Sequence, residues 1–182
     1  MFEKTLKTKK IYQGRIIGLR DDEVELATGV LSHREICEHP GAVAVVALTD
    51  NSEIVLIRQF RKPTEQILIE IPAGLFNNDE GLENAALREL KEETGYVAKN
   101  IKHALSMYTS PGYSTELLHY FLATDLTKEK QNYEEDEHIE VELTKIEKLS
   151  QMVKGGQIKD GKTIVGLWIA ENMSNKVNRP TG

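Results

Sequence analysis

Residues 74–96 read GLFNNDEGLENAALRELKEETGY, a segment that sets several carboxylates between two glycines. Its apolar residues recur every three or four positions, which predicts an amphipathic helix from Leu82 to Thr94. Three carboxylates fall on one side of that helix, because residues three and four apart are neighbours on its surface. They are Glu89, Glu92 and Glu93. Their like charges repel one another, so solvent or a bound cation must offset them. A hard divalent cation is the preferred explanation, and a solvated acidic helix is the alternative.

The two ends and the other faces of this helix are also predicted. Asn78 or Asp79 is expected to cap the N-terminus, and Gly95 suits the left-handed position that ends a helix. Ala85 is expected among the carboxylates, where a small side chain leaves room for a ligand. An apolar stripe is expected to pack against the core. It consists of Leu82, Ala86, Leu87 and Leu90.

The segment resembles the signature of the Nudix hydrolase family. The positions that match are Gly74, Glu80, Arg88, Glu89, Leu90, Glu92, Glu93 and Gly95, and Tyr96 replaces an aliphatic residue of the signature. The resemblance implies a loop-helix-loop that holds Mg²⁺, with Mn²⁺ as the alternative cation. Magnesium suits the ligands better than zinc, because they are all carboxylate or carbonyl oxygens.

The resemblance also assigns roles to individual residues. The expected metal ligands are the carbonyl of Ala73 and the carboxylates of Glu89, Glu92, Glu93 and Glu137. Glu92 is included among the catalytic residues as well, Arg88 is expected to orient a glutamate, and Glu80 is expected to be structural.

Residues on both sides of the helix resemble the ADP-ribose pyrophosphatase branch of the family. Pro111 lies in a Ser-Pro-Gly turn, sixteen residues beyond Gly95, where the branch has a downstream proline. Ser-Pro-Gly is also a good turn signal in any protein. The expected substrate contacts are Arg58, Arg61, Glu70, Pro111, Gly112 and Glu116, with an arginine on phosphate and a glutamate holding the substrate. An arginine at a strand edge is otherwise a solvated side chain.

A second acidic run, residues 134–141, resembles the loop that carries the catalytic glutamate in this branch. Glu135 is the first candidate for the general base and Glu137 the second. The resemblance then implies magnesium-dependent hydrolysis of ADP-ribose to AMP and ribose 5-phosphate. A Nudix hydrolase for a nucleotide sugar or a dinucleoside polyphosphate is one alternative. A noncatalytic ADP-ribose sensor is another.

Composition limits the class of protein. The chain has 182 residues, of which 40% are hydrophobic, enough for one good core. A net charge of −6 argues against a nucleic-acid partner. Cys37 is the single cysteine, so no intramolecular disulfide forms, and no signal peptide or long apolar run is evident. We expect a cytoplasmic enzyme that acts on a small nucleotide substrate and has no membrane partner.

The pattern along the chain is mixed α/β. Short strands are predicted from Ile11 to Leu19, Glu23 to Thr28 and Leu31 to Ile36, and Asp50-Asn51 is predicted to form a hairpin turn. The resemblance implies an α/β/α sandwich with a mixed sheet over residues 41–182, including C-terminal helices, after an antiparallel β unit over residues 1–40. In this branch such a unit completes the partner's pocket, so a homodimer is expected. A monomer, in which these strands cover a sheet edge, is the alternative.

Overall fold

The computed structural model describes residues 2–77, 79–129 and 139–177, with side chains described as far as Asn172. Its contacts divide the chain into two compact units. The first unit consists of Met1–Ala42 and Ser106–Leu118, and the second consists of Val43–Leu105 and His119–Gly182. The described part of the chain holds no helix that is long and apolar enough to cross a membrane.

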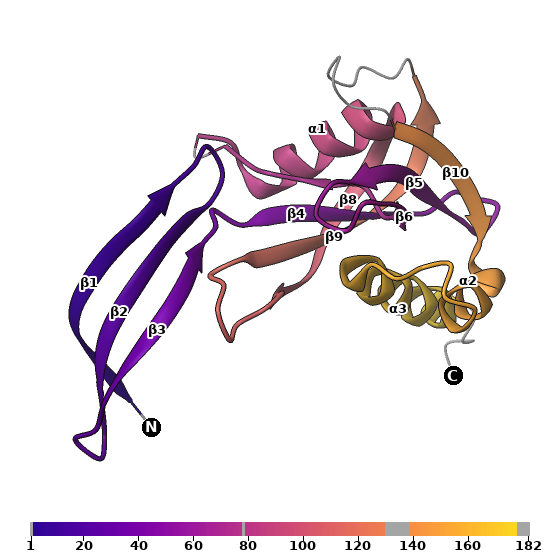
Figure 1. The fold of residues 1–182 in the computed structure, drawn as a ribbon. Helices are drawn as coiled ribbons and strands as arrows, with labels where there is room; N and C mark the ends of the chain where they lie inside the picture. The colour runs from indigo at the N-terminus through magenta and orange to yellow at the C-terminus, as the bar shows by residue number, and fades with distance from the viewer. Residues whose placement is uncertain (1, 78, 130–138, 178–182) are drawn as a thin grey trace. The chain divides into compact units, whose positions relative to one another are not determined.

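The first unit contains an antiparallel sheet of three strands in the order β1-β2-β3 (Figure 1). They are β1 (Glu3–Gln13), β2 (Gly18–Leu26) and β3 (Leu31–Glu38). The bounds predicted for the first two strands were wrong, because the chain turns inside the first of them, where Gly14 N–H donates to the Ile17 carbonyl over 2.9 Å.

The strand that the sequence pattern missed, β1, is rich in lysine instead of apolar residues. Its lysines face acidic residues of β2 across the ladder, with Lys7 opposite Glu23 and Lys9 opposite Asp21. Opposite charges on facing strands stabilise an antiparallel pair, so charge complementarity replaces apolar alternation as the signal for β1.

Residues 106–118 belong to the first unit through hydrogen bonds to β3. They include the end of β8 (Tyr96–Tyr108) and the start of β9 (Leu117–Lys128). Cys37 N–H donates to the Tyr113 carbonyl over 2.7 Å, and Thr115 N–H donates to the Cys37 carbonyl over 3.0 Å. The turn between β8 and β9 is therefore fixed against β3.

The second unit contains two further sheets. One has the order β10-β5-β6 and consists of β10 (Ile139–Lys145), β5 (Glu53–Arg61) and β6 (Gln66–Glu70). The other has the order β7-β4-β9-β8 and includes β7 (Ala73–Gly74) and β4 (Ala42–Ala47). The predicted turn at Asp50-Asn51 is present, with Thr49 N–H bonded to the Glu53 carbonyl at 2.9 Å. It carries the chain from one sheet to the other.

Helices lie on both sides of these strands, with α1 (Leu82–Thr94) on one side and α2 (Ile146–Lys154) and α3 (Gly161–Val177) on the other (Figure 1). The predicted α/β sandwich is confirmed. A core of short and branched side chains joins β4 to α1 and β9. It includes Val43, Val45, Ala47, Ala85, Ala86, Leu90 and Phe121.

The predicted bounds of α1 are confirmed, and two details of it were wrong. The residue before the helix is Gly81, and no side chain caps it. Ala85 is fully buried in the core and does not lie in a ligand space among the carboxylates. Gly95 has the expected left-handed conformation, with φ of 71°, and ends the helix.

Candidate active site

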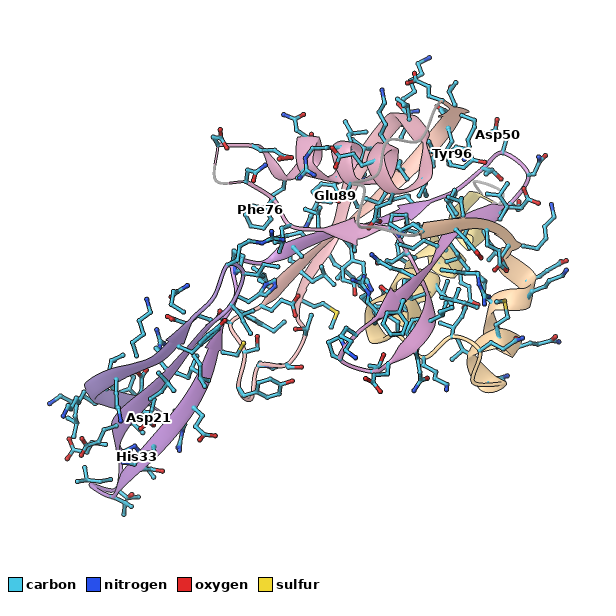
Figure 2. All side chains as sticks on the ribbon, turned by 45° about the horizontal axis from the view of Figure 1, so that its top comes forward. Asp21, His33, Asp50, Phe76, Glu89 and Tyr96 are labelled. Carbon is cyan, nitrogen blue, oxygen red and sulfur yellow. The ribbon has the colours of Figure 1, made fainter. Side chains whose placement is uncertain are left out.

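The short strand β7 brings two carboxylates of α1 against its backbone. β4 holds this strand by pairing Ala44 with Ala73. Ala73 N–H donates to Oε2 of Glu93 over 3.0 Å. The Glu89 carboxylate lies so close to Gly74 that a Cβ there would be 2.2 Å from its Cδ, far inside contact distance. Figure 2 labels Glu89 on α1. Glycine at position 74 therefore permits the approach of Glu89.

Arg88 gathers the other carboxylates of the segment. Its Nε donates to Glu80 Oε1 over 2.9 Å, and its Nη1 donates to Glu89 Oε1 over 2.7 Å and to Glu92 Oε2 over 3.0 Å. Nη2 donates to the Leu75 carbonyl over 2.9 Å. We call Glu80, Arg88, Glu89 and Glu92 the α1 cluster.

The charges of the α1 cluster act on one another. Burial tends to lower the pKa of Arg88, but the hydrogen bonds that Arg88 donates to Glu80 and Glu89 outweigh it and raise that pKa. The hydrogen bond from Arg88 in turn lowers the pKa of Glu80. In the α1 cluster a single arginine thus faces three carboxyl groups.

The carboxylates beside β7 fit a hard divalent cation by their chemistry. Glu93 is 5% exposed, and the Glu89 and Glu93 carboxylates reach the two successive residues of this strand, Gly74 and Ala73. Their oxygens are the donors that Mg²⁺ prefers. In the described part of the chain, no three His, Cys, Asp or Glu residues form a ready-made metal cluster.

Arg61 and Glu70, which the sequence assigned to the substrate, bind each other. Nε and Nη2 of Arg61 donate to the two oxygens of Glu70, each over 2.8 Å. The Glu70 side chain is 1% exposed. Burial raises the pKa of Glu70, but Arg61 and Lys162 lower it by more, so the net pKa is below its ordinary value.

The sequence analysis missed Lys162. Its Nζ donates to Glu70 Oε2 and, over 3.0 Å, to Asp160 Oδ2. Asp160 also accepts from Thr163 N–H over 2.9 Å, so it caps the N-terminus of α3. The only signal in the sequence was this cap, two residues before the lysine. We call Arg61, Glu70, Asp160 and Lys162 the α3 cluster.

The other predicted substrate residues belong to β5 and to the first unit. Arg58 lies 3.8 Å from Glu140 and 3.9 Å from Glu142, on the face of β5 opposite to Arg61. Pro111, Gly112 and Glu116 belong to the first unit, where Thr109 Oγ1 donates to Glu116 Oε2 over 2.5 Å. Glu135 and Glu137 lie outside the described residues.

The family of the chain follows from a comparison with known domains. Residues 38–164 match the NUDIX domain. The chain belongs to the Nudix family. The Nudix match contains both clusters, β7 and most of the two sheets of the second unit.

Known relatives match most of the chain. An ADP-ribose pyrophosphatase from Bacillus subtilis is 45% identical over 88% of this chain and 88% of its own length. A methanol dehydrogenase activator from Bacillus methanolicus is 44% identical over 91% of this chain and 90% of its own length.

A solved structure shares the Nudix fold of this chain. The crystal structure of an ADP compounds hydrolase superposes with a TM-score of 0.88, covering 99% of this chain and 98% of that one. The two sequences are 21% identical, so this similarity establishes the fold alone.

Proposed function

We propose that this Nudix protein is a magnesium-dependent ADP-ribose pyrophosphatase, which hydrolyses ADP-ribose to AMP and ribose 5-phosphate. The observation that carries the reaction class is that the carboxylates of Glu89 and Glu93 both lie against the strand Ala73–Gly74 of the Nudix segment. The choice of substrate rests on the 45% identity to the relative named ADP-ribose pyrophosphatase.

The proposed metal ligands are the Ala73 carbonyl, Glu89, Glu92 and Glu93, with Glu137 outside the described residues. Divalent cations, Mg²⁺ or alternatively Mn²⁺, would neutralise the pyrophosphate and lower the pKa of a bound water. Other groups of the chain position these carboxylates. Arg88 donates hydrogen bonds to Glu89 and Glu92, and Ala73 N–H donates one to Glu93.

The remaining roles concern substrate and proton. Arg61 is proposed to bind a pyrophosphate oxygen, because Glu70 fixes one edge of its guanidinium and its side chain is still 36% exposed. Glu135 or Glu137 is proposed to take the proton of the attacking water. Further substrate contacts are proposed for Arg58, Pro111, Gly112 and Glu116.

Product analysis tests the function directly. The protein is incubated with Mg²⁺ in heavy-oxygen water and a panel of ADP-ribose, ADP-sugars, GDP-sugars, dinucleoside polyphosphates and dGTP, and the products are identified by mass spectrometry. We expect ADP-ribose to be cleaved preferentially, with the label in AMP if water attacks the adenosine-side phosphorus. Preference for another compound would refute the substrate. Binding of ADP-ribose without turnover of any compound would favour a sensor.

We also propose that the protein is a cytoplasmic homodimer that uses the first unit. The β1-β2-β3 sheet exposes several large apolar side chains, and exposed apolar area of this kind marks interaction surfaces. They are Leu6, Ile11, Tyr12, Leu19 and Leu31. Light scattering should give twice the 20.5 kDa chain mass. A single-chain mass at micromolar concentration would refute the dimer.

A further inference from the structure

The α3 cluster surrounds one deeply buried carboxylate. Both oxygens of Glu70 accept hydrogen bonds from Arg61, and Lys162 adds a third donor on Oε2. A buried carboxylate is costly unless cations and hydrogen-bond donors surround it. Asp160 balances the second cation, because Lys162 Nζ also donates to its Oδ2 over 3.0 Å. The four charges therefore cancel.

Lys162 has a fixed position because the start of α3 is attached to the end of β6. Thr163 Oγ1 donates to Asp160 Oδ2 over 2.6 Å and accepts a hydrogen bond from Ile71 N–H over 2.8 Å. α3 also packs closely on this strand end, since a Cβ at Gly166 would lie 2.8 Å from Ile71 Cδ1. The ammonium of Lys162 is thus held beside Glu70 by backbone, not only by its own flexible chain.

The arrangement leaves one edge of Arg61 open. Its Nε and Nη2 are bound to Glu70, and its Nη1 has no hydrogen bond to any residue that the structure describes. Lys162, by contrast, uses its ammonium on two carboxylates and is 17% exposed. Arg61 therefore presents donors to a ligand, whereas Lys162 supports the carboxylate that holds Arg61.

We propose that Lys162 is a positioning residue for substrate binding: it fixes the Glu70 carboxylate, and through it the Arg61 guanidinium, in the orientation that receives a pyrophosphate oxygen. This inference rests on the proposed function, because it takes Arg61 as the phosphate contact. A fork that is already oriented loses less entropy on binding, so the benefit falls on substrate affinity.

The first experiment measures ADP-ribose hydrolysis by Lys162→Met. KM should rise about tenfold, which equals about 1.4 kcal/mol, and kcat should stay within about threefold. Lys159→Met is the matched control: Lys159 precedes α3, contacts Gln66 Oε1 at 3.4 Å and loses the same charge. Its KM should equal that of the wild type. Lys162→Arg should restore most of the affinity, since it returns a cation to Glu70.

A double-mutant cycle tests whether Lys162 acts through Arg61. Arg61→Lys removes the fork, so the same Lys162→Met change should then alter KM by less than about twofold. Additive effects of the two substitutions would overturn the proposal, because they would mean that Lys162 contacts the substrate independently.

Two further readouts separate positioning from a merely structural role. A lower melting temperature of Lys162→Met with an unchanged KM would overturn the proposal, and so would a shifted magnesium activation constant with an unchanged KM. If Lys162→Met does not fold, Lys162→Gln retains a donor to Glu70 without the charge and should raise KM by a smaller factor. An unchanged KM in that variant would also overturn the proposal.

The two proposals fail in different ways. A wild-type chain that does not hydrolyse ADP-ribose would refute the proposed function. Wild-type hydrolysis together with an unchanged KM in Lys162→Met and Lys162→Gln would refute only the positioning role.

Discussion

The α1 cluster sets one guanidinium against three carboxylates, whereas the α3 cluster pairs two cations with two carboxylates. Both consist of acidic and basic side chains of the second unit. The α1 cluster keeps an excess of negative charge beside β7, which a divalent cation would relieve. The α3 cluster has equal numbers of positive and negative groups around a buried carboxylate, so it fixes the orientation of its own side chains. The difference in charge balance thus separates a place that attracts a ligand from a place that orients one.

The largest expected effect comes from the acidic side of this comparison. Glu93→Gln keeps an oxygen that accepts the Ala73 N–H bond but removes a charge from the proposed metal ligands. Turnover of ADP-ribose should fall about a thousandfold, because ligands of a catalytic metal supply several kcal/mol of transition-state stabilisation. Initial rates at saturating Mg²⁺ measure the change. Glu83→Gln, on the exposed first turn of α1, is the control. Wild-type turnover in Glu93→Gln would end the metal assignment.

A smaller effect is expected when β7 is displaced and no charge is changed. Gly74→Ala puts a Cβ 2.2 Å from Cδ of Glu89, so Glu89 or β7 must shift. Because residues that orient metal ligands typically contribute ten- to hundredfold, activity should fall by about that factor and the magnesium activation constant should rise. Gly161→Ala, where a Cβ meets nothing within 4 Å, should leave both values unchanged. Equal activity in the two variants would contradict the proposal that Gly74 in β7 permits the position of Glu89.

The α3 cluster predicts a change in acid stability. The folded pKa of Glu70 lies below its ordinary value of 4.5, so the unfolded chain binds more protons there and stability falls as pH drops from about 4.5 through the folded pKa. Lys162→Met removes one of the causes that lower this pKa, so the variant has less stability to lose above about pH 4.5 and unfolds at a higher pH. The midpoint of acid unfolding, followed by circular dichroism, should rise by about 0.3 pH unit. Lys159→Met should keep the wild-type midpoint, and a shared shift would assign the effect to net charge.

The smallest effect is expected for an ion pair that belongs to neither cluster. Lys62 Nζ lies 2.7 Å from Glu65 Oε1, but the two side chains are 80% and 71% exposed. Solvent screens such a pair, so Lys62→Gln should change the free energy of unfolding by no more than about 0.5 kcal/mol. Urea denaturation measures it. A larger loss would show that burial does not explain the difference between this pair and the clusters.

Local patterns predicted the parts of the fold that depend on neighbours in sequence. The bounds of α1 followed from apolar spacing and from Gly95, since a helix is set by residues three and four apart. β1 escaped prediction because its lysines are matched by acidic residues of β2, which only the ladder reveals. The cap of α1 was also missed, because Gly81 offers no side chain to recognise.

The candidate site divides in the same way. The sequence indicated Glu89, Glu92, Glu93 and Arg88, because their spacing on one helix already puts them together. It did not indicate that Arg61 binds Glu70, or that Lys162 joins them across 92 residues of chain. It also placed Ala85 among ligands, whereas packing against β4 and β9 buries that side chain.

The sequence by itself determined the family, the acidic helix and the kind of cation that its oxygens suit, since these follow from residue type and local spacing. Only the tertiary structure decided which side chains neutralise Glu70, how close Glu89 comes to Gly74 and that Ala85 is buried in the core. The physical reason is that charge pairing and close packing depend on distances between segments remote in sequence. Those distances exist only once β6, α1 and α3 are assembled around their sheets.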